Sequence, residues 1–236
     1  MDYFGESEPA GETEADFFDF VPLPAGELLV AIGDVSKHGT GAAIIRSGLQ
    51  AFLRGPSISE QPLTELAQGL NRSICDISPE NFFATLFAAR IDPLRRELRY
   101  VSAGHEPALL FHRKSGRLRR LERTGTVLGL TTRAVYQQRV VLIEPGDTLL
   151  AFTDGIIEAA DARGRQFTEQ GVRRVLEDYP EANARELSGC ILEAVQTFRD
   201  RAAPADDGTV TVVRLVDRSM VRPLAEHAEE LAVAAA

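Results

Sequence analysis

Four acidic residues stand at the ends of apolar segments of this chain, where packing alone does not call for a carboxylate. Asp34 ends the segment LLVAIGD, and Asp154 ends the segment TLLAFTD. Asp206 and Asp16 have the opposite order, because each precedes an apolar run. Short apolar runs bounded by turn residues are typical of buried strands. If strands that begin with Asp run antiparallel to strands that end with Asp, all four carboxylates meet at one edge.

One hairpin supports this arrangement directly. The turn Pro24-Ala25-Gly26 lies midway between Asp16 and Asp34, each of which is nine residues from Ala25. Residues equally distant from the centre of an antiparallel turn lie opposite one another. We therefore expect Asp16 and Asp34 to be cross-strand neighbours.

Carboxylates gathered at one edge repel one another, so such a site takes up protons or binds cations. Oxygen ligands without His or Cys favour the hard divalent ions Mg²⁺ and Mn²⁺. Two ions bridged by Asp34, with the carbonyl of Val35 as a further ligand, would activate a water for phosphoryl displacement. The sequence has no G-x-S-x-G motif, no Cys flanked by His and no Walker loop, so no protein nucleophile is evident.

Two histidines have two interpretations each. His105 follows a predicted strand and either contacts phosphate or donates a proton at the site, or it holds a loop as a structural residue. His38 lies in the loop after Asp34 and is either a proton donor to a leaving alkoxide or an exposed loop residue.

Other Asp residues are assigned ordinary roles. A single Asp after a strand is usually a turn former or a helix cap. Asp19 alternates with two Phe residues and is expected to face solvent, and Asp207 is the weaker candidate of its pair. Asp147, in Pro-Gly-Asp, is interpreted as a turn residue only.

Composition limits the class of protein. A formal net charge of −9 argues against a nucleic-acid partner, because phosphate binding needs a basic surface. A hydrophobic content of 44% is sufficient for a full core. Cys75 and Cys190 lack metal-ligand spacing and are expected to be buried thiols. No apolar run of about eighteen residues and no signal peptide is present, so we expect a cytoplasmic protein without a membrane partner.

The elements that position the carboxylates follow from hydrophobic periodicity. We expect an N-terminal segment 1–15 that is loop apart from a strand stub at 2–4, a domain at 16–217 and a helical tail at 218–236. Helices are expected at 41–54, 60–77, 166–178 and 183–199, and strands at 16–22, 28–33, 82–92, 97–104, 107–114, 117–123, 136–144, 148–154 and 209–215. The predicted class is α+β, a sandwich of antiparallel sheets with helix pairs on its outer faces.

Six blocks of the chain, taken together and in order, resemble the bacterial SpoIIE-type (RsbU-like) phosphatases of the PPM superfamily of metal-dependent serine/threonine phosphatases. The blocks are ADFFDFVPL, AIGDVSKHGTGAA, FFATLFAARIDPLRRELRYVSAGHEPALL, LGL, IEPGDTLLAFTDGIIEA and DDGTVTVV, and they run from about residue 9 to 215. The resemblance implies a dinuclear Mn²⁺ or Mg²⁺ centre. Asp34, Asp154 and Asp206 would be its carboxylate ligands and Val35 its backbone ligand, and Asp16 would assist the second metal directly or through water.

The resemblance also implies a function. The expected substrate is phosphoserine or phosphothreonine on a STAS-domain anti-sigma-factor antagonist in a bacterial partner-switching pathway. The helix pair 41–77 would then control formation of the metal site, with an upstream activator protein or homodimerisation as the stimulus.

The chain also departs from the family pattern. Ala15 stands where Gly is usual, and residues 37–38 and 40–41 differ in the loop after Asp34. We expect no sensory domain ahead of Asp16, because the preceding segment is short, so the sequence is expected to be either a free-standing enzyme or a fragment. The alternative function is a catalytically weak or inactive PPM-like regulatory binding module.

Overall fold

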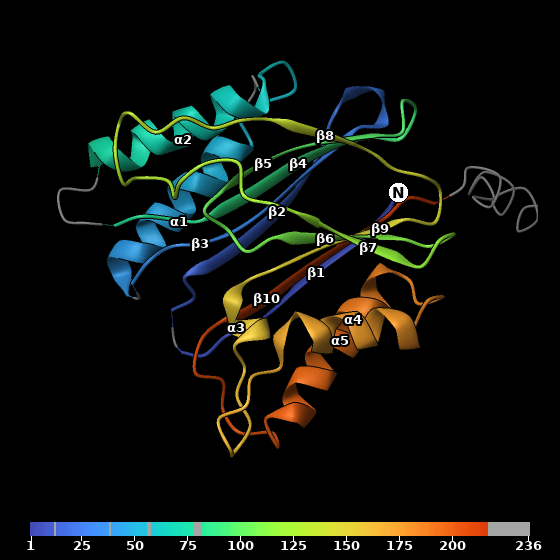
Figure 1. The fold of residues 1–236 in the computed structure, drawn as a ribbon. Coiled ribbons are helices and arrows are strands. Elements are labelled where there is room, and N and C mark those ends of the chain that lie inside the picture. Colours follow the sequence, from blue (N-terminus) through green and yellow to red (C-terminus); the bar gives the residue numbers. More distant parts are fainter. Residues whose placement is uncertain (12, 38, 56–57, 78–81, 217–236) are drawn as a thin grey trace, which may run out of the picture.

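Two five-stranded antiparallel sheets form the centre of the protein, as the sequence predicted (Figure 1). The computed structural model describes residues 1–11, 13–37, 39–55, 58–77 and 82–216. Sheet A has the order β1 (Asp2–Glu8), β10 (Gly208–Arg214), β9 (Thr148–Phe152), β6 (Ala108–His112) and β7 (Arg117–Leu121). Sheet B has the order β2 (Asp16–Pro22), β3 (Leu28–Asp34), β4 (Leu86–Asp92), β5 (Glu97–Ala103) and β8 (Arg139–Leu142).

Helices cover both outer faces. The helices α1 (Thr40–Leu53) and α2 (Leu63–Ile77) lie on sheet B, and α4 (Thr168–Asp178) and α5 (Ala184–Phe198) lie on sheet A (Figure 1). A one-turn helix, α3 (Asp154–Ile157), follows β9, and a 3-10 turn (Pro24–Gly26) joins β2 to β3. The α+β sandwich is therefore confirmed. Within the described ranges, no helix is long and apolar enough to cross a membrane.

The continuous apolar run of β3 is explained by its place between two hydrophobic layers. Leu29 and Ala31 belong to the layer between sheet B and the helices α1 and α2. Leu28, Val30 and Ile32 point the other way, into the layer between the sheets. A third layer lies between sheet A and the helices α4 and α5. A strand buried on both faces needs apolar residues at every position rather than at alternate ones.

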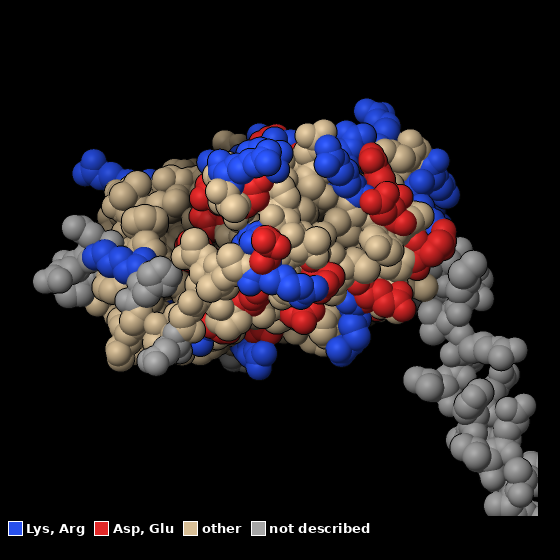
Figure 2. Space-filling model, turned by 90° about the horizontal axis from the view of Figure 1, so that it is seen from below, with Lys and Arg blue, Asp and Glu red and all other residues tan. Residues whose placement is uncertain are grey.

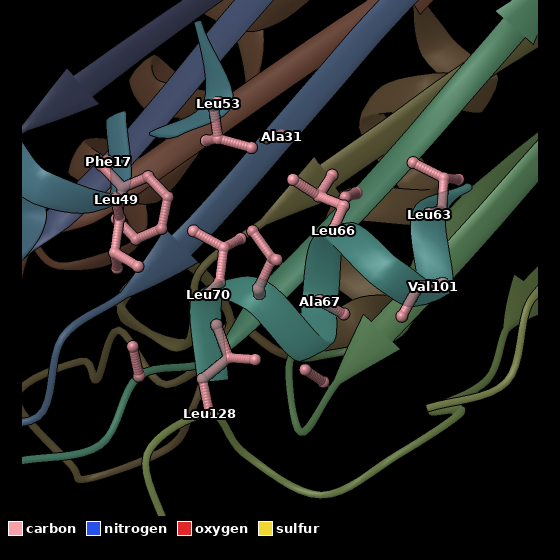
Figure 3. Packing of buried hydrophobic residues seen from close by; sticks show 14 of the residues in the cluster. Phe17, Ala31, Leu49, Leu53, Leu63, Leu66, Ala67, Leu70, Val101 and Leu128 are labelled. Atoms are coloured by element: carbon pink, nitrogen blue, oxygen red, sulfur yellow. The ribbon is translucent and has the colours of Figure 1, made fainter. Parts of the chain in front are cut away.

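The layer beneath α2 gives a direct test of this packing. Leu66 is 1% exposed and points from α2 toward sheet B (Figure 3). We expect Leu66→Ala to lower the free energy of unfolding by about 2–5 kcal/mol, because the lost methyl groups leave a cavity. Leu94→Ala is the control, since Leu94 is 59% exposed and its truncation should cost less than about 0.5 kcal/mol. Equal urea midpoints for the two variants would contradict this layer.

The N-terminal prediction was wrong beyond Phe4. β1 continues to Glu8 and pairs with β10, from Asp2 opposite Arg214 to Glu8 opposite Gly208. The segment GESE looked like loop because it is polar, but an edge strand keeps one backbone edge in solvent and tolerates polar residues. The first strand thus belongs to the same sheet as the last one.

Two Asp residues also differ from the prediction. Asp19 is 4% exposed rather than solvent-facing, and its two carboxylate oxygens accept hydrogen bonds from Arg54 at 2.6 and 2.8 Å. Asp147 is more than a turn residue, because it is buried and its Oδ2 lies 2.8 Å from Nδ1 of His112. In both cases the partner comes from another element, so no local pattern indicates it.

Other differences are smaller. The turn before Asp147 is present, but β8 pairs with β5 whereas β9 pairs with β10 and β6, so this turn passes from one sheet to the other. Cys75 and Cys190 are free thiols but only partly buried. The predicted helical tail 218–236 lies outside the described residues.

Candidate active site at the edge shared by the sheets

The register of the first hairpin confirms the predicted neighbours. Asp16 and Asp34 are cross-strand partners in the β2–β3 ladder. Gly33 allows this pair to lie close to β4, since a Cβ there would stand 2.2 Å from the carbonyl oxygen of Thr85. Thr85 in turn accepts a hydrogen bond from the Asp34 amide through its Oγ1 and donates its own amide to the Asp34 carbonyl.

Asp16 also joins the two sheets. Its Oδ2 accepts hydrogen bonds from the hydroxyls of Thr153 and Thr209, each at 2.7 Å, and both Thr residues belong to sheet A or its margin. Burial raises the pKa of Asp16 to about 8; the two Thr hydroxyls oppose this shift, and the charges of Asp34 and Asp207 add to it. Ionisation of Asp16 therefore costs free energy unless a positive charge lies nearby.

The second pair of carboxylates lies where β9 ends and β10 begins. Asp154 opens α3, and Asp206 is just ahead of β10, which pairs antiparallel with β9. Burial raises the pKa of Asp154, and the charge of Asp206 raises it further. Gly155 makes this approach feasible, because a Cβ at that position would stand 2.0 Å from the backbone oxygen of Asp207.

Asp207 is buried and binds the backbone of the segment ahead of Asp16. It is 2% exposed, and its two carboxylate oxygens accept the backbone amides of Ala10 and Ala15 at 2.7 and 2.8 Å. Asp207 therefore fixes the loop that leads into Asp16. Because both of its oxygens accept backbone amides, it is a weaker candidate for a direct metal ligand than Asp206. Asp206 is the exposed member of the pair.

The surroundings of His105 favour the structural one of its two interpretations. It is 2% exposed, and its Nδ1 lies 2.9 Å from Oγ1 of Thr85. Its ring thus supports the Thr85 hydroxyl that receives the Asp34 amide. Its Nε2 is buried and makes no hydrogen bond of normal geometry with any described residue. We interpret His105 as a positioning residue for Asp34.

The buried imidazole predicts a pH dependence of stability. Burial lowers the pKa of His105 to about 4; the nearby Phe152 carbonyl opposes this shift, and the charge of Arg123 adds to it. Between the unfolded pKa near 6.5 and the folded value, the unfolded state binds the extra proton, so stability falls as pH falls. Urea unfolding at pH 7 and 4.5 should show that the wild type loses about 2–3 kcal/mol more than His105→Gln. Parallel losses would contradict a buried neutral His105.

The sequence did not indicate several residues that hold the site. Thr85, Thr153 and Thr209 were not singled out, although Thr in a buried strand needs a hydrogen-bond partner and is therefore a usable signal. Arg46 donates from Nη1 to the carboxylate of Glu14 at 2.9 Å and to the Asp16 carbonyl at 3.3 Å. His38 lies outside the described residues.

The chemistry of these donors fits hard divalent ions, since all four side chains supply oxygen and two have raised pKa values that a cation would reverse. In the part of the chain that the structure describes, no three Asp, Glu, His or Cys side chains lie close enough to hold one ion. The metal-binding roles of Asp16, Asp34, Val35, Asp154 and Asp206 therefore stay predictions.

The fold is that of solved PP2C domains. The structure superposes on the SiaA-PP2C domain of Pseudomonas aeruginosa with a TM-score of 0.77 and 17% identity, covering 90% of this chain and 85% of that one. The PP2C phosphatase domain of SpoIIE from Bacillus subtilis gives a TM-score of 0.77 and 18% identity, covering 90% of this chain and 63% of that one.

The sequence comparisons specify the family. The model for Stage II sporulation protein E (SpoIIE) matches residues 24–216, and the chain belongs to this family. It is 28% identical to the phosphoserine phosphatase RsbU of Bacillus subtilis over 216 residues, which are 91% of this chain and 63% of RsbU. The chain spans less than two thirds of the length of the curated relatives it matches.

Proposed function

We propose that this chain is a metal-dependent phosphoprotein phosphatase that hydrolyses phosphoserine or phosphothreonine. The observation that carries the proposal is the placement of Asp16 opposite Asp34, and of Asp154 beside Asp206, at one end of a SpoIIE-family sandwich. The name of RsbU, a phosphoserine phosphatase, supports the same chemistry.

Each residue has a defined task in this proposal. Asp34, Asp154, Asp206 and the Val35 carbonyl would hold Mn²⁺ or Mg²⁺, and Asp16 would assist. Bound ions supply Lewis acidity and an activated water for phosphoryl displacement. The chain itself fixes the donors: the Thr153 and Thr209 hydroxyls orient Asp16. The pKa of Asp16, raised to about 8 by burial, would keep this carboxyl largely protonated at pH 7 without ions, so that ion binding would release its proton.

The substrate and partners belong to the proposal as well. We propose a phosphorylated STAS-domain anti-sigma-factor antagonist as substrate, in a partner-switching pathway, with an upstream activator or homodimerisation controlling α1 and α2. The exposed apolar side chains Ile44 on α1 and Ile77 on α2 are consistent with a contact at these helices.

A regulatory binding module without turnover is the second candidate. It is favoured by the observation that no three ligating side chains already converge among the described residues. Titration calorimetry with MnCl₂ separates the two candidates, because a phosphatase binds the ion at or below millimolar concentration. The phosphatase should also hydrolyse a phosphoserine peptide with Mn²⁺ and stop when EDTA is added. Absence of both binding and hydrolysis would leave the binding module.

A further inference from the structure

A strongly basic hairpin stands out in this acidic chain. Residues 111–123, FHRKSGRLRRLER, contain six of the 26 Lys and Arg residues and one acidic residue, although the whole chain has a net charge of −9. This segment covers the end of β6, the turn and β7. On the face that carries α4 and α5, basic and acidic side chains are interspersed, with basic groups projecting at the rim (Figure 2). A local excess of positive charge is therefore a feature of the hairpin and not of the molecule.

Two arginines of this hairpin differ from the others. Four of its cations have acidic partners, in the ion pairs Arg113–Glu181, Lys114–Glu144, Arg120–Glu169 and Arg123–Glu106. The guanidinium groups of Arg117 and Arg119 are exposed and form no ion pair or hydrogen bond with the described residues, although the Arg117 amide donates to Oγ of Ser115. As alternate residues of a strand they project from the same face, about 7 Å apart. An extended chain with acidic residues at every second position has the same spacing.

The backbone of β7 is available on one side. β7 is the last strand of sheet A and pairs with β6, from Arg117 opposite His112 to Leu121 opposite Ala108, and no described strand lies on its other edge. Charged edge strands also serve merely to prevent aggregation. A hollow of about 470 Å³ lined by His112, Ser115, Arg117, Leu118 and Arg119 favours a ligand, because it gives incoming side chains a place beside the strand.

The direction of β7 links it to the candidate active site. The sheet register aligns Arg120 with Leu109 and Leu109 with Leu150, so β7 runs toward the same end as β9. Just beyond β7, Arg123 Nε donates to the His105 carbonyl at 3.0 Å. Asp154 lies about five residues further along the strand direction than Arg119 and about two strand spacings across the sheet. The distance between them is therefore about 20 Å, which about six residues of extended chain would span.

We propose that β7 is a docking strand for an extended acidic segment of the phosphoprotein substrate, an inference that rests on the proposed function. The segment adds to the free edge of β7 as a further strand of sheet A. Its alternate carboxylates pair with Arg117 and Arg119, and a phosphorylated residue about six positions away reaches the carboxylate edge. Backbone pairing supplies affinity, and the two guanidinium groups select acidic side chains.

The test measures binding without turnover. A fluorescein-labelled peptide of eight alternating Glu and Val residues is titrated with the full chain, and its anisotropy gives Kd. The variant Arg117→Glu with Arg119→Glu should weaken binding at least tenfold. The matched control, Arg133→Glu with Arg163→Glu, reverses two exposed arginines elsewhere and should stay within twofold. Hydrolysis of p-nitrophenyl phosphate with Mn²⁺, a substrate too small to reach β7, should be the same in both variants.

Further outcomes distinguish the possible occupants and separate this proposal from the proposed function. A peptide with Gln in place of Glu, or with Pro at its centre, should bind at least tenfold more weakly than the parent. Equal binding of the Pro peptide, or equal loss of affinity in the two double variants, would overturn strand docking. Binding of phosphatidylserine vesicles that displaces the peptide would instead indicate a membrane contact and overturn the proposal. Failure of the wild type to hydrolyse p-nitrophenyl phosphate, with peptide binding intact, would contradict the proposed function alone.

Discussion

Asp154→Asn is expected to lower Mn²⁺-dependent hydrolysis of a phosphoserine peptide by about 10²–10³-fold while the protein stays folded. A metal ion contributes several kcal/mol to stabilising transition-state charge, and each 1.36 kcal/mol corresponds to a tenfold change in rate. The amide side chain keeps the shape of Asp154, including an oxygen that can accept the Gly155 amide at 3.0 Å. It removes the negative charge, so the predicted ligand is lost without a cavity.

Stability should change in the opposite sense. The pKa of Asp154 is raised by burial and by Asp206, so the fold disfavours its ionised form. Replacing it by a neutral amide removes that cost, and the Tm without metal should be equal to or higher than that of the wild type. Asp178→Asn, at the exposed end of α4, is the matched control and should leave both activity and Tm unchanged. Wild-type hydrolysis by Asp154→Asn would remove this residue from the site.

The sequence predicted that Asp16 and Asp34 are cross-strand neighbours because the signal for this pairing is local. Each Asp stands next to an apolar run, and the nine-residue symmetry about Ala25 sets the pairing of Asp16 with Asp34. The helices α4 and α5 were predicted for the same reason, since their apolar faces have helical spacing.

The errors concern residues whose partners are distant along the chain. The buried carboxylate of Asp19 accepts hydrogen bonds from Arg54, the residue that follows α1, and the local pattern of β2 does not indicate that partner. β1 was missed beyond Phe4 because its pairing with β10 joins the two ends of the domain. Burial of a polar residue is decided by such long-range contacts, which local periodicity does not report.

Gly155→Ala is expected to damage both stability and activity, because the added methyl group would meet backbone rather than a movable side chain. Its Cβ would lie 2.0 Å from the carbonyl oxygen of Asp207 and 3.3 Å from that of Asp206. The start of α3 and the start of β10 must then separate, which moves Asp154 away from Asp206. We expect a loss of about 1–3 kcal/mol in the free energy of unfolding. Mn²⁺-dependent hydrolysis should fall by at least about 10²-fold, because a displacement of about 1 Å at a reacting site has that effect.

Gly189→Ala separates this close approach from a general effect of replacing glycine. Gly189 lies within α5, and a Cβ there would meet nothing within 4 Å. Alanine is the better helix former by about 0.5–1 kcal/mol, so this variant should be more stable than the wild type and equally active. Both variants are measured by urea unfolding and by Mn²⁺-dependent hydrolysis. If Gly155 serves to bring the segments of Asp154 and Asp206 together, Gly155→Ala should lower the free energy of unfolding and Gly189→Ala should raise it. If Gly155→Ala is instead as stable and active as Gly189→Ala, Asp154 and Asp206 do not depend on this contact, and their assignment to one site loses its structural basis.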